Sequence, residues 1–411
     1  MYETNGATLK MLMSDKEFSG KYGKEYNETM EKAQFFINNP KKLIEKAQTE
    51  TPKNNLRLIA PFVDKFSHDM TYFKGFVKYP HRLKNYIVSK NEAYSTTRSY
   101  LPTIMDLEPN STCNFKCIMC QVSNWKNGKR ADDMPFEEFK TFCDGNNHFT
   151  EVKLHGMGEP LLHNKYFDMV EYLSSQHIWT RTSINGSLLH VKNNHKNLID
   201  AGIGEIQCSF DGATKEIYEK IRVNSNFERI VKNFTLLNHY ANTKDRPFTR
   251  MWALIQKANR HQIFDFVKLA FKMNFKRLSF SVSLNDWGRE AWNQSNKQLQ
   301  INKFTPEEHA KLIKLSKAHD IDITLWEQGS RYSTESKEKL CSWVFNRPYI
   351  SSDLKVVPCC MIADPDVVNF GDSRDFSNVW NNKNYQNFRQ LHIDGKIPNC
   401  CKNCYLGLCN E

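Results

Sequence analysis

Three cysteines stand close together in the run Cys-x3-Cys-x2-Cys, formed by Cys113, Cys117 and Cys120. Three thiolates on one loop can bind three irons of a [4Fe–4S] cluster and leave the fourth iron without a protein ligand. An iron with an open coordination position can bind a small molecule and pass an electron to it. The spacing therefore predicts redox chemistry at this loop.

Closely spaced cysteines can also bind zinc or form disulfide bonds. A structural zinc ion takes four ligands, usually from paired Cys-x2-Cys units. This run offers three sulfurs, and the next histidine along the chain is His148. The spacing thus favours an iron–sulfur cluster over zinc, and zinc over disulfide bonds.

The residues around the three cysteines resemble a known signature. The run Glu108–Cys120, with the sequence EPNSTCNFKCIMC, is similar to the cluster-binding loop of radical S-adenosylmethionine (radical SAM) enzymes. The resemblance implies that the open iron chelates S-adenosylmethionine, and that one electron cleaves it to a 5′-deoxyadenosyl radical that abstracts hydrogen from a substrate. It also implies that Met119, which stands where the family often has an aromatic residue, lies near the adenine.

Composition places the chain among globular proteins with metal sites. It has 411 residues, 40% of them hydrophobic and 12% aromatic, which is enough for two or three domains. No apolar run approaches the roughly 20 residues of a membrane helix, and residues 1–10 lack the apolar core of a secretory signal. Twelve cysteines without an export signal indicate a reducing compartment, so we expect a cytoplasmic protein with no membrane partner.

The net charge of +11 suits an acidic partner such as a phosphorylated substrate, an acidic peptide or RNA. The lysines are spread along the chain, however, as on any solvated surface. A different class of function, a non-catalytic zinc-binding module that recognises nucleic acid, would account for the charge. It leaves the spacing of Cys113, Cys117 and Cys120 unexplained, and a nucleic-acid partner is therefore the weaker expectation.

Apolar periodicity divides the chain into residues 1–100, 101–330 and 331–411. The first part carries helical patterns such as Glu25–Asn38 and contains no cysteine. The second alternates strands with helices, and its strands are predicted at Thr103–Leu107, Glu151–His155, Trp179–Ile184, Glu205–Phe210, Thr249–Ile255 and Arg277–Val282. The helices between them are predicted at Tyr166–Ser174, Lys192–Ala201, Lys215–Ile221, Glu228–Ala241 and Gln262–Met273. A last helix begins after the N-cap Thr305, with Glu308 completing a capping box, and ends near His319.

Alternation of strands and helices builds a parallel sheet covered by helices, which is an α/β fold. Six repeats fit the partial (β/α)6 TIM-like barrel that the family resemblance implies. We expect this barrel to carry an N-terminal helical extension and a small cysteine-rich C-terminal domain. Active sites of such barrels lie at the carboxyl ends of the strands, so the functional loops should follow strands.

The loop Gly156–Pro160 follows the second predicted strand. Its glycines let the backbone approach a ligand closely, and a glutamate can accept hydrogen bonds from an ammonium group. The loop resembles the GGEP-type motif of the family, with Met157 in place of the first glycine. The resemblance implies that Gly158 and Glu159 bind the amino group of S-adenosylmethionine. An ordinary turn is the alternative.

Two more loops carry polar residues at strand ends. Ser183 and Asn185 follow the third strand and Ser209 ends the fourth, and both segments resemble family elements that contact ribose or carboxylate oxygens. The resemblance implies these contacts here, and it implies that Arg222 pairs with the carboxylate of the cofactor. A turn at Asn185 and a helix cap at Asp211 are the alternatives.

Seven of the twelve cysteines lie at or beyond Cys341, namely Cys341, Cys359, Cys360, Cys400, Cys401, Cys404 and Cys409. Their order resembles the C-terminal auxiliary-cluster domain of radical SAM enzymes, in its full SPASM or shorter twitch form. The last distant cysteine of the full form is missing, so the resemblance favours one auxiliary [4Fe–4S] cluster. Its ligands are then Cys341, Cys359, Cys401 and Cys404, with Cys360 and Cys400 as adjacent alternates. A zinc ribbon is the alternative.

The hairpin arm Asp353–Cys359 has Leu354 where the family usually has glycine, which puts the turn geometry in question. Cys143 and Cys208 are expected to be plain buried residues. No general base stands out, although Asp286, Glu327, Tyr349 and Asp364 lie in or near loops that could face a substrate.

The sequence thus predicts a radical SAM enzyme that oxidises, epimerises or crosslinks a peptide or a sugar-like small molecule. The resemblance implies two [4Fe–4S] clusters, S-adenosylmethionine, and a reducing electron donor such as a flavodoxin or ferredoxin. Residues 1–100 contain no recognised leader-peptide-binding module, which leans slightly against a ribosomal peptide.

Overall fold

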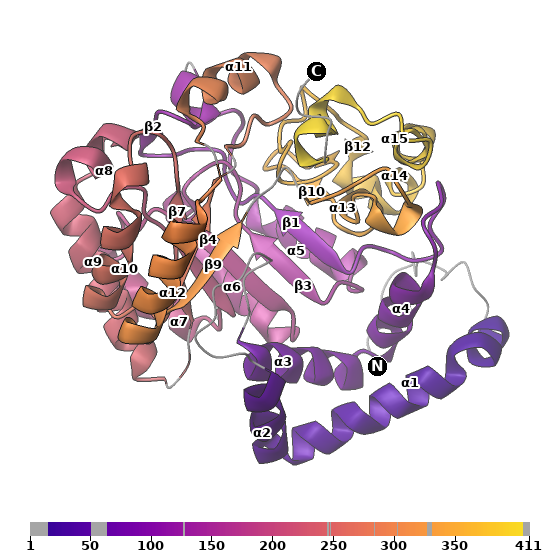
Figure 1. Cartoon of the computed structure of the whole chain (residues 1–411). Coiled ribbons are helices and arrows are strands. Elements are labelled where there is room, and N and C mark those ends of the chain that lie inside the picture. The colour runs from indigo at the N-terminus through magenta and orange to yellow at the C-terminus, as the bar shows by residue number, and fades with distance from the viewer. Residues whose placement is uncertain are drawn as a thin grey trace.

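A ten-stranded sheet runs through the molecule in the order β12-β11-β10-β1-β3-β4-β5-β7-β8-β9 (Figure 1). The computed structural model describes residues 15–50, 64–125, 128–244, 246, 248–282, 284–301, 303–326 and 331–405. Seven neighbouring strands are parallel to one another: β1 (Ile104–Leu107), β3 (Glu151–Leu154), β4 (Trp179–Ile184), β5 (Glu205–Ser209), β7 (Thr249–Leu254), β8 (Arg277–Ser281) and β9 (Asp322–Trp326). The predicted α/β architecture is confirmed. Each of the six predicted strands lies within one residue of its expected ends, and β9 adds a seventh.

Helices cover the outer face of these strands (Figure 1). They are α5 (Phe136–Gly145), α6 (Tyr166–Ser175), α7 (Asn194–Asp200), α8 (Lys215–Ile221), α9 (Phe227–Asn242), α10 (Ile263–Lys272) and α12 (Pro306–His319). Helix α11 (Glu290–Leu299) stands apart from this layer (Figure 1). The capping box of α12 is confirmed, because the Thr305 hydroxyl accepts from the Glu308 amide and the Glu308 carboxylate accepts from the Thr305 amide.

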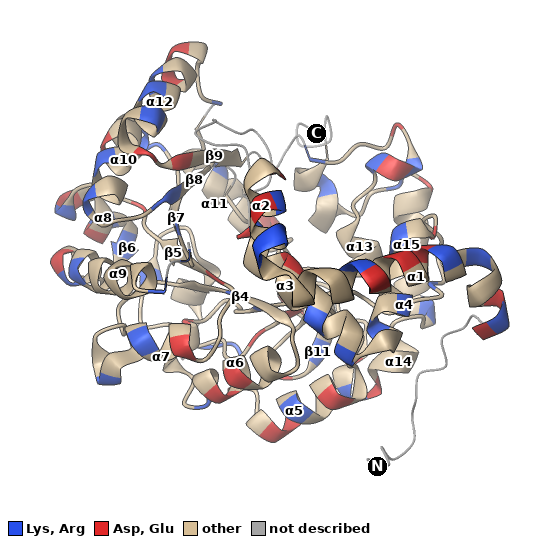
Figure 2. Ribbon diagram, turned by 90° about the horizontal axis from the view of Figure 1, so that it is seen from below, with Lys and Arg blue, Asp and Glu red and all other residues tan. Residues whose placement is uncertain are grey.

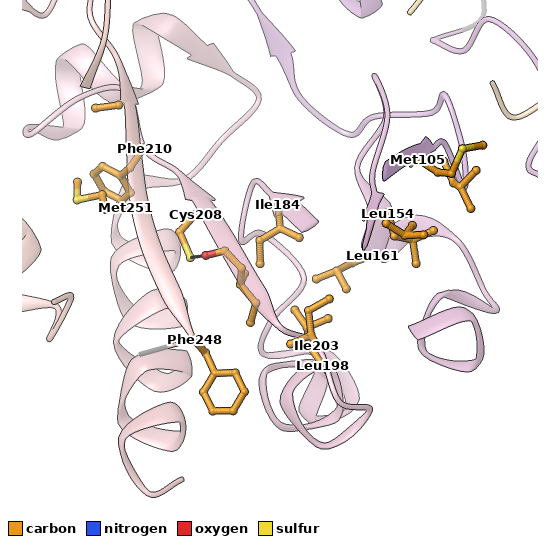
Figure 3. Close-up of a cluster of buried hydrophobic side chains, with 14 of the residues drawn as sticks. Met105, Leu154, Leu161, Ile184, Leu198, Ile203, Cys208, Phe210, Phe248 and Met251 are labelled. Atoms are coloured by element: carbon orange, nitrogen blue, oxygen red, sulfur yellow. Dashed lines mark hydrogen bonds between the residues drawn. The ribbon is translucent and has the colours of Figure 1, made fainter. Parts of the chain in front are cut away.

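The apolar core lies between the sheet and these helices. Side chains alternate along a strand, so Val152 and Leu154 of β3 belong to the core while Glu151 and Lys153 take the opposite face. Figure 3 shows Met105, Leu154, Ile184, Cys208 and Met251, contributed by five neighbouring strands, among the side chains of this core.

The first described segment folds as four helices, α1 (Asp15–Asn38), α2 (Pro40–Glu50), α3 (Lys65–Lys78) and α4 (Pro80–Asn91). They share an apolar cluster of their own that includes Phe18, Leu43 and Phe76. The ring of His68 lies 5.3 Å from that of Trp179, the first residue of β4, and Arg82 donates to the carbonyl of Gln176 at 2.9 Å. These helices therefore pack at the amino ends of the strands, away from the expected site.

Charged residues of both signs are interspersed on the helices, as α1, α5 and α12 show in Figure 2. This pattern fits the expectation of an ordinary solvated surface. Within the described ranges, no helix combines the length and the apolarity that a bilayer crossing requires.

The cysteine-rich segment extends the sheet at the β1 edge. Strand β10 (Tyr349–Ile350) pairs parallel with β1, and β11 (Lys355–Val357) and β12 (Gly371–Asp372) follow antiparallel. The helices α13 (Trp343–Asn346), α14 (Phe376–Val379) and α15 (Lys383–Ile393) pack around them (Figure 1). Leu354, in the turn between β10 and β11, adopts a φ of 64°, the left-handed conformation that favours glycine. The hairpin therefore keeps the glycine-type turn without the glycine.

The inner face of the sheet carries charged residues. Glu205 on β5 accepts hydrogen bonds from Arg250 on β7 at 3.4 Å and from Arg277 on β8 at 2.9 Å, and all three side chains are buried. Burial opposes ionisation of Glu205, but the two guanidinium groups outweigh it and lower its pKa to about 2. One carboxylate thus balances two buried cations across three strands.

Replacing Glu205 with glutamine should lower the free energy of unfolding by about 3–5 kcal/mol, because two buried guanidinium groups lose their shared counter-charge. The exposed pair Glu228 and Lys215 offers the matched control, and Glu228→Gln should leave the free energy of unfolding nearly unchanged. Urea unfolding of both variants checks the difference.

Because the folded pKa of Glu205 is lowered, its contribution to the free energy of unfolding is complete above its unfolded pKa of 4.5. This contribution is lost as the pH falls toward about 2. Equal stability of the two variants would contradict this account.

Candidate active site

The loop that carries the first three cysteines follows β1 and is fixed by a short ribbon. Strand β2 (Lys116–Cys117) pairs antiparallel with β6 (Arg222–Val223), which places Cys117 opposite Arg222. The amide of Ile118 also donates to the carbonyl of Ile221 at 3.0 Å. The chain after α8 therefore holds the cysteine loop at the carboxyl end of β1.

The three thiols lie close enough to influence one another electrostatically. Burial, together with Glu159 and Cys117, raises the pKa of Cys113 to about 12, and burial with Cys117 and Cys113 raises that of Cys120 to about 12. Such thiols stay protonated unless a metal replaces the proton, and a coordinating metal removes the proton outright. The donor set thus fits an iron–sulfur cluster.

No group of three or more His, Cys, Asp or Glu side chains in the described part of the chain is placed to hold a single metal ion. A [4Fe–4S] cluster distributes its thiolate ligands over separate irons, so they stand farther apart than the ligands around one zinc ion.

The loop Gly156–Pro160 packs directly on the segment that leads into the cysteines. A Cβ on Gly156 would lie 2.2 Å from the Glu108 Cγ, and a Cβ on Gly158 would lie 2.2 Å from the Asn110 Oδ1. Asn110 Nδ2 donates to the carbonyl of Glu159 at 3.1 Å. The glycines therefore allow two loops to meet, a reason that differs from the close ligand approach expected from the sequence.

Glu159 is buried and connects the second and third strand ends. Its Oε2 accepts from the Asn185 amide at 2.7 Å and its Oε1 from the Leu161 amide at 3.4 Å. Burial raises the pKa of Glu159 to about 7. Asn185 in turn donates from Nδ2 to Asn114 Oδ1 at 2.9 Å, and the same nitrogen lies 4.0 Å from Cys113 Sγ. The predicted residues Glu159 and Asn185 thus meet beside the cysteine loop.

The other residues predicted to contact the cofactor lie in three different places. Ser183 and Ser209 lie side by side on β4 and β5, with 3.4 Å between their hydroxyl oxygens. Arg222 forms an ion pair with buried Asp211, 2.6 Å from Nη2 to Oδ2, and its predicted pairing with a cofactor carboxylate stays a prediction. The N-cap of α8 is Thr214, so a cap at Asp211 does not explain that residue. Met119 is buried in the apolar core.

The four cysteines predicted as auxiliary ligands lie together. Burial raises the pKa of Cys359, and Cys360, Cys341 and Cys404 add to the effect. The pKa of Cys401 is raised by a hydrogen bond with Cys400 and by burial, with Cys359 and Cys341 contributing. Each of the four is therefore within electrostatic reach of others in the set.

The two alternates lie next to this set and also contact residues outside it. Cys360 lies beside Asp106, Lys153 and Arg347 on the inner side of the sheet. A Cβ added to Gly288 would lie 2.8 Å from the Cys400 Cβ, which places Cys400 against the loop before α11. Cys409 lies outside the described residues.

The loop residues considered as bases have structural partners. Asp286 accepts from the Gly288 amide at 2.8 Å, and Asp364 pairs with Arg289 at 2.6 Å. Tyr349 belongs to an apolar cluster with Trp287, against which Cys120, Met157 and Cys360 pack. This cluster lies between the first cysteine loop and the cysteine-rich segment. Glu327 lies outside the described residues.

Sequence reasoning missed three polar residues on the inner face, Lys153, His155 and Arg347. Strand alternation could have found the first two, since Val152 and Leu154 fix which face Lys153 and His155 take. Arg347 reaches the same place only through the pairing of β10 with β1, which no local pattern predicts.

The sequence matches the family model of the radical SAM superfamily over residues 107–270, the range that contains the cysteine loop and the polar ends of β3, β4 and β5. Residues 107–270 are a radical SAM domain. A second family model, the SPASM iron–sulfur cluster-binding domain, matches residues 341–405. The two domains are therefore of types that bind [4Fe–4S] clusters and S-adenosylmethionine, which favours this interpretation over a zinc-binding module.

Curated relatives are similar over different lengths. The chain is 32% identical over 108 residues to the tungsten-containing aldehyde ferredoxin oxidoreductase cofactor-modifying protein of Pyrococcus furiosus, covering 26% of this chain and 30% of that protein. It is 23% identical to the PqqA peptide cyclase of Bradyrhizobium diazoefficiens, covering 75% of this chain and 80% of that one. It is also 23% identical to the mycofactocin maturase MftC of Mycolicibacterium smegmatis, covering 41% of this chain and 42% of that protein, so the chain spans less than half the length of two of these three relatives.

Solved structures share the fold. Streptococcus suis SuiB bound to S-adenosylmethionine superposes with a TM-score of 0.57 at 13% identity, covering 91% of this chain and 79% of that one. This likeness extends over the N-terminal helices, the barrel and the cysteine-rich segment together, because so much of the chain is covered.

Proposed function

We propose that this radical SAM protein reductively cleaves S-adenosylmethionine and uses the product to abstract hydrogen from a peptide substrate. The observation that carries the proposal is the placement of three mutually interacting thiols at the carboxyl end of β1, beside Glu159 and Asn185. When bound, the cluster and S-adenosylmethionine supply a 5′-deoxyadenosyl radical. The inner face of the barrel supplies the enclosed space in which that radical meets only its target.

Each of the strand-end residues has a proposed task. Cys113, Cys117 and Cys120 hold the catalytic cluster, and the main-chain pairing of Cys117 with Arg222 fixes the loop. Gly158 and Glu159 present the amino-group site. The further contacts of the cofactor are assigned to Met119, Ser183, Asn185, Ser209 and Arg222.

We propose one auxiliary [4Fe–4S] cluster, held by Cys341, Cys359, Cys401 and Cys404. The electrostatic contacts within this set support it, and Cys360 and Cys400 are the adjacent alternates because they also contact residues outside the set. Four thiolates leave no open iron, which suits electron exchange with the substrate more than substrate binding.

A peptide is the substrate class that we favour over a sugar. Relatives whose names refer to peptide or cofactor maturation, the PqqA peptide cyclase and the mycofactocin maturase MftC, support it. The sequence of residues 1–100 contains no recognised leader-binding module, which is an argument against a ribosomal peptide. The four helices of this part of the chain pack at the amino ends of the strands, away from the proposed site. A reducing donor such as a flavodoxin or ferredoxin, and a cytoplasmic location, complete the proposal.

Anaerobic reconstitution of the full chain tests the proposal. We expect about eight irons per chain if both clusters fill, and 5′-deoxyadenosine from S-adenosylmethionine after reduction with dithionite. Iron analysis and chromatography of the nucleoside products measure the two outcomes. Stoichiometric zinc in place of iron, without 5′-deoxyadenosine, would overturn it in favour of the zinc-binding alternative.

A further inference from the structure

The inner face of the barrel holds one lysine among ion pairs. Lys153 on β3 is in register with Asp106 on β1 and with Arg181 on β4, so the three side chains start from one level of the sheet. Cys360 of the cysteine-rich segment lies beside the same lysine. This level is therefore enclosed by two barrel strands and the segment that carries the auxiliary cysteines.

The carboxylates near Lys153 are already engaged. Asp106 receives Arg347 on both oxygens, at 2.8 and 3.0 Å, and Glu151 is paired with Arg181. Within the described ranges, no hydrogen bond or ion pair reaches the Lys153 ammonium. In each of these two ion pairs, the charge of the arginine cancels that of the carboxylate. The charge of the Lys153 ammonium is therefore the one at this level of the sheet that no ion pair among the described residues balances.

His155 stands two residues farther along β3, toward the cysteine loop. Burial, with Lys153, Arg347 and Arg181 as further causes, keeps its pKa well below the usual value, so the ring is neutral. No protein partner is found for its ring nitrogens in the described part of the chain. Lys153 and His155 thus form a short line of unused hydrogen-bonding groups that leads from the barrel interior to Gly156, the first residue of the loop Gly156–Pro160.

We propose that Lys153, with His155 above it, binds a carboxylate of the substrate inside the barrel. The inference rests on the proposed function and specifies its substrate as one with an acidic group near the reacting carbon. The Lys153 side chain is half-buried, and a carboxylate would supply its ammonium with both a counter-charge and hydrogen-bond acceptors. One unbalanced cation fits a monoanion better than a doubly charged phosphate. Burial lowers the pKa of Lys153, and a carboxylate beside it would favour the charged form.

Binding of three capped peptides to the reconstituted enzyme, kept without reductant, tests the inference. The peptides are N-acetyl-Ala-Glu-Ala-amide, N-acetyl-Ala-Gln-Ala with a free C-terminal carboxylate, and N-acetyl-Ala-Gln-Ala-amide. Saturation-transfer NMR up to about 10 mM peptide measures the affinities. We expect at least one acidic peptide to bind about tenfold or more tightly than the neutral one, and the tighter of the two identifies a side-chain or a terminal carboxylate.

Three variants assign the effect to the lysine. Lys153→Met should remove the preference for the acidic peptide, Lys153→Arg should keep most of it, and Lys317→Met, on the exposed face of α12, should leave it unchanged. No preference in the wild type, no detectable binding of either acidic peptide, or an unchanged preference in Lys153→Met would overturn the inference.

Substrate-free formation of 5′-deoxyadenosine, measured in parallel, separates this inference from the proposed function. It should persist in Lys153→Met, because the lysine is assigned to the substrate and not to S-adenosylmethionine. Its loss in Lys153→Met, with the cluster iron retained, would reassign the lysine to the cofactor and overturn the inference. Its absence from the wild type, with carboxylate binding intact, would overturn the proposed function alone.

Discussion

Replacing Cys117 with alanine should abolish the formation of 5′-deoxyadenosine from S-adenosylmethionine. The thiol of Cys117 stands between its two partners in the loop, and its main chain pairs with Arg222. Two thiolates cannot hold three corners of a cluster, so the variant should bind about four irons instead of about eight. Nucleoside chromatography should find less than about a thousandth of the wild-type product, since the electron that cleaves the sulfonium comes from this cluster.

Cys208→Ala is the matched control for this experiment. Cys208 is a fully buried cysteine of β5 whose thiol donates to the carbonyl of Ile206, and it lies in the core between sheet and helices (Figure 3). Its loss should cost about 1–2 kcal/mol of stability, as for a small buried side chain, and leave both iron and product unchanged. Undiminished cleavage in Cys117→Ala would contradict the assignment of the catalytic cluster. Equal loss of product in both variants would mean that the effect comes from misfolding.

The cysteine loop could be read from the sequence because its donors are local. Cys113, Cys117 and Cys120 lie within eight residues, and no tertiary contact is needed to bring them together. The contacts that fix the loop are not local. Asn110 reaches the carbonyl of Glu159 across 49 residues, and the partner that the structure gives Arg222 is Asp211. Spacing predicts a donor set, whereas its surroundings depend on which strands become neighbours.

The elements missed by sequence reasoning were hidden for physical reasons. Strand β9 has five residues and begins soon after α12, whose C-cap Asp320 reverses the chain in the left-handed conformation with a φ of 51°. Asp320 gives no glycine signal for that turn. The helix α5 follows Pro135 and buries Phe139 and Phe142, but it lies inside the first long connection, where the cysteine loop dominates the pattern.

The charged residues inside the barrel are a second case in which the sequence does not show which residues become neighbours. Alternation along β3 and β5 assigns Lys153 and Glu205 to the inner face, but it does not say which charges neutralise one another. Glu205 meets Arg250 and Arg277 because β5, β7 and β8 are neighbours in the sheet. The unbalanced position of Lys153 emerges only after all these pairs are assigned, which requires the three-dimensional structure.

Replacing Cys404 with alanine should remove the auxiliary cluster alone. The expected iron content is about four per chain, with the wild-type rate of 5′-deoxyadenosine formation in the absence of substrate. The reason is spatial, because Cys404 lies with Cys341 and Cys359, whereas the catalytic thiols follow β1. Conversion of substrate should fall at least about a hundredfold, because the substrate radical loses the group that exchanges an electron with it.

Cys400→Ala separates a lost ligand from a disturbed segment. Both cysteines lie in the short 3-10 helix Asn399–Cys404, but Cys400 packs against Gly288 and the loop before α11. The Cys400 variant should keep about eight irons and its substrate conversion. If Cys400→Ala loses four irons and Cys404→Ala keeps all of its iron, Cys400 is the cluster ligand and Cys404 is not. Loss of all iron in Cys404→Ala would contradict two independent sites.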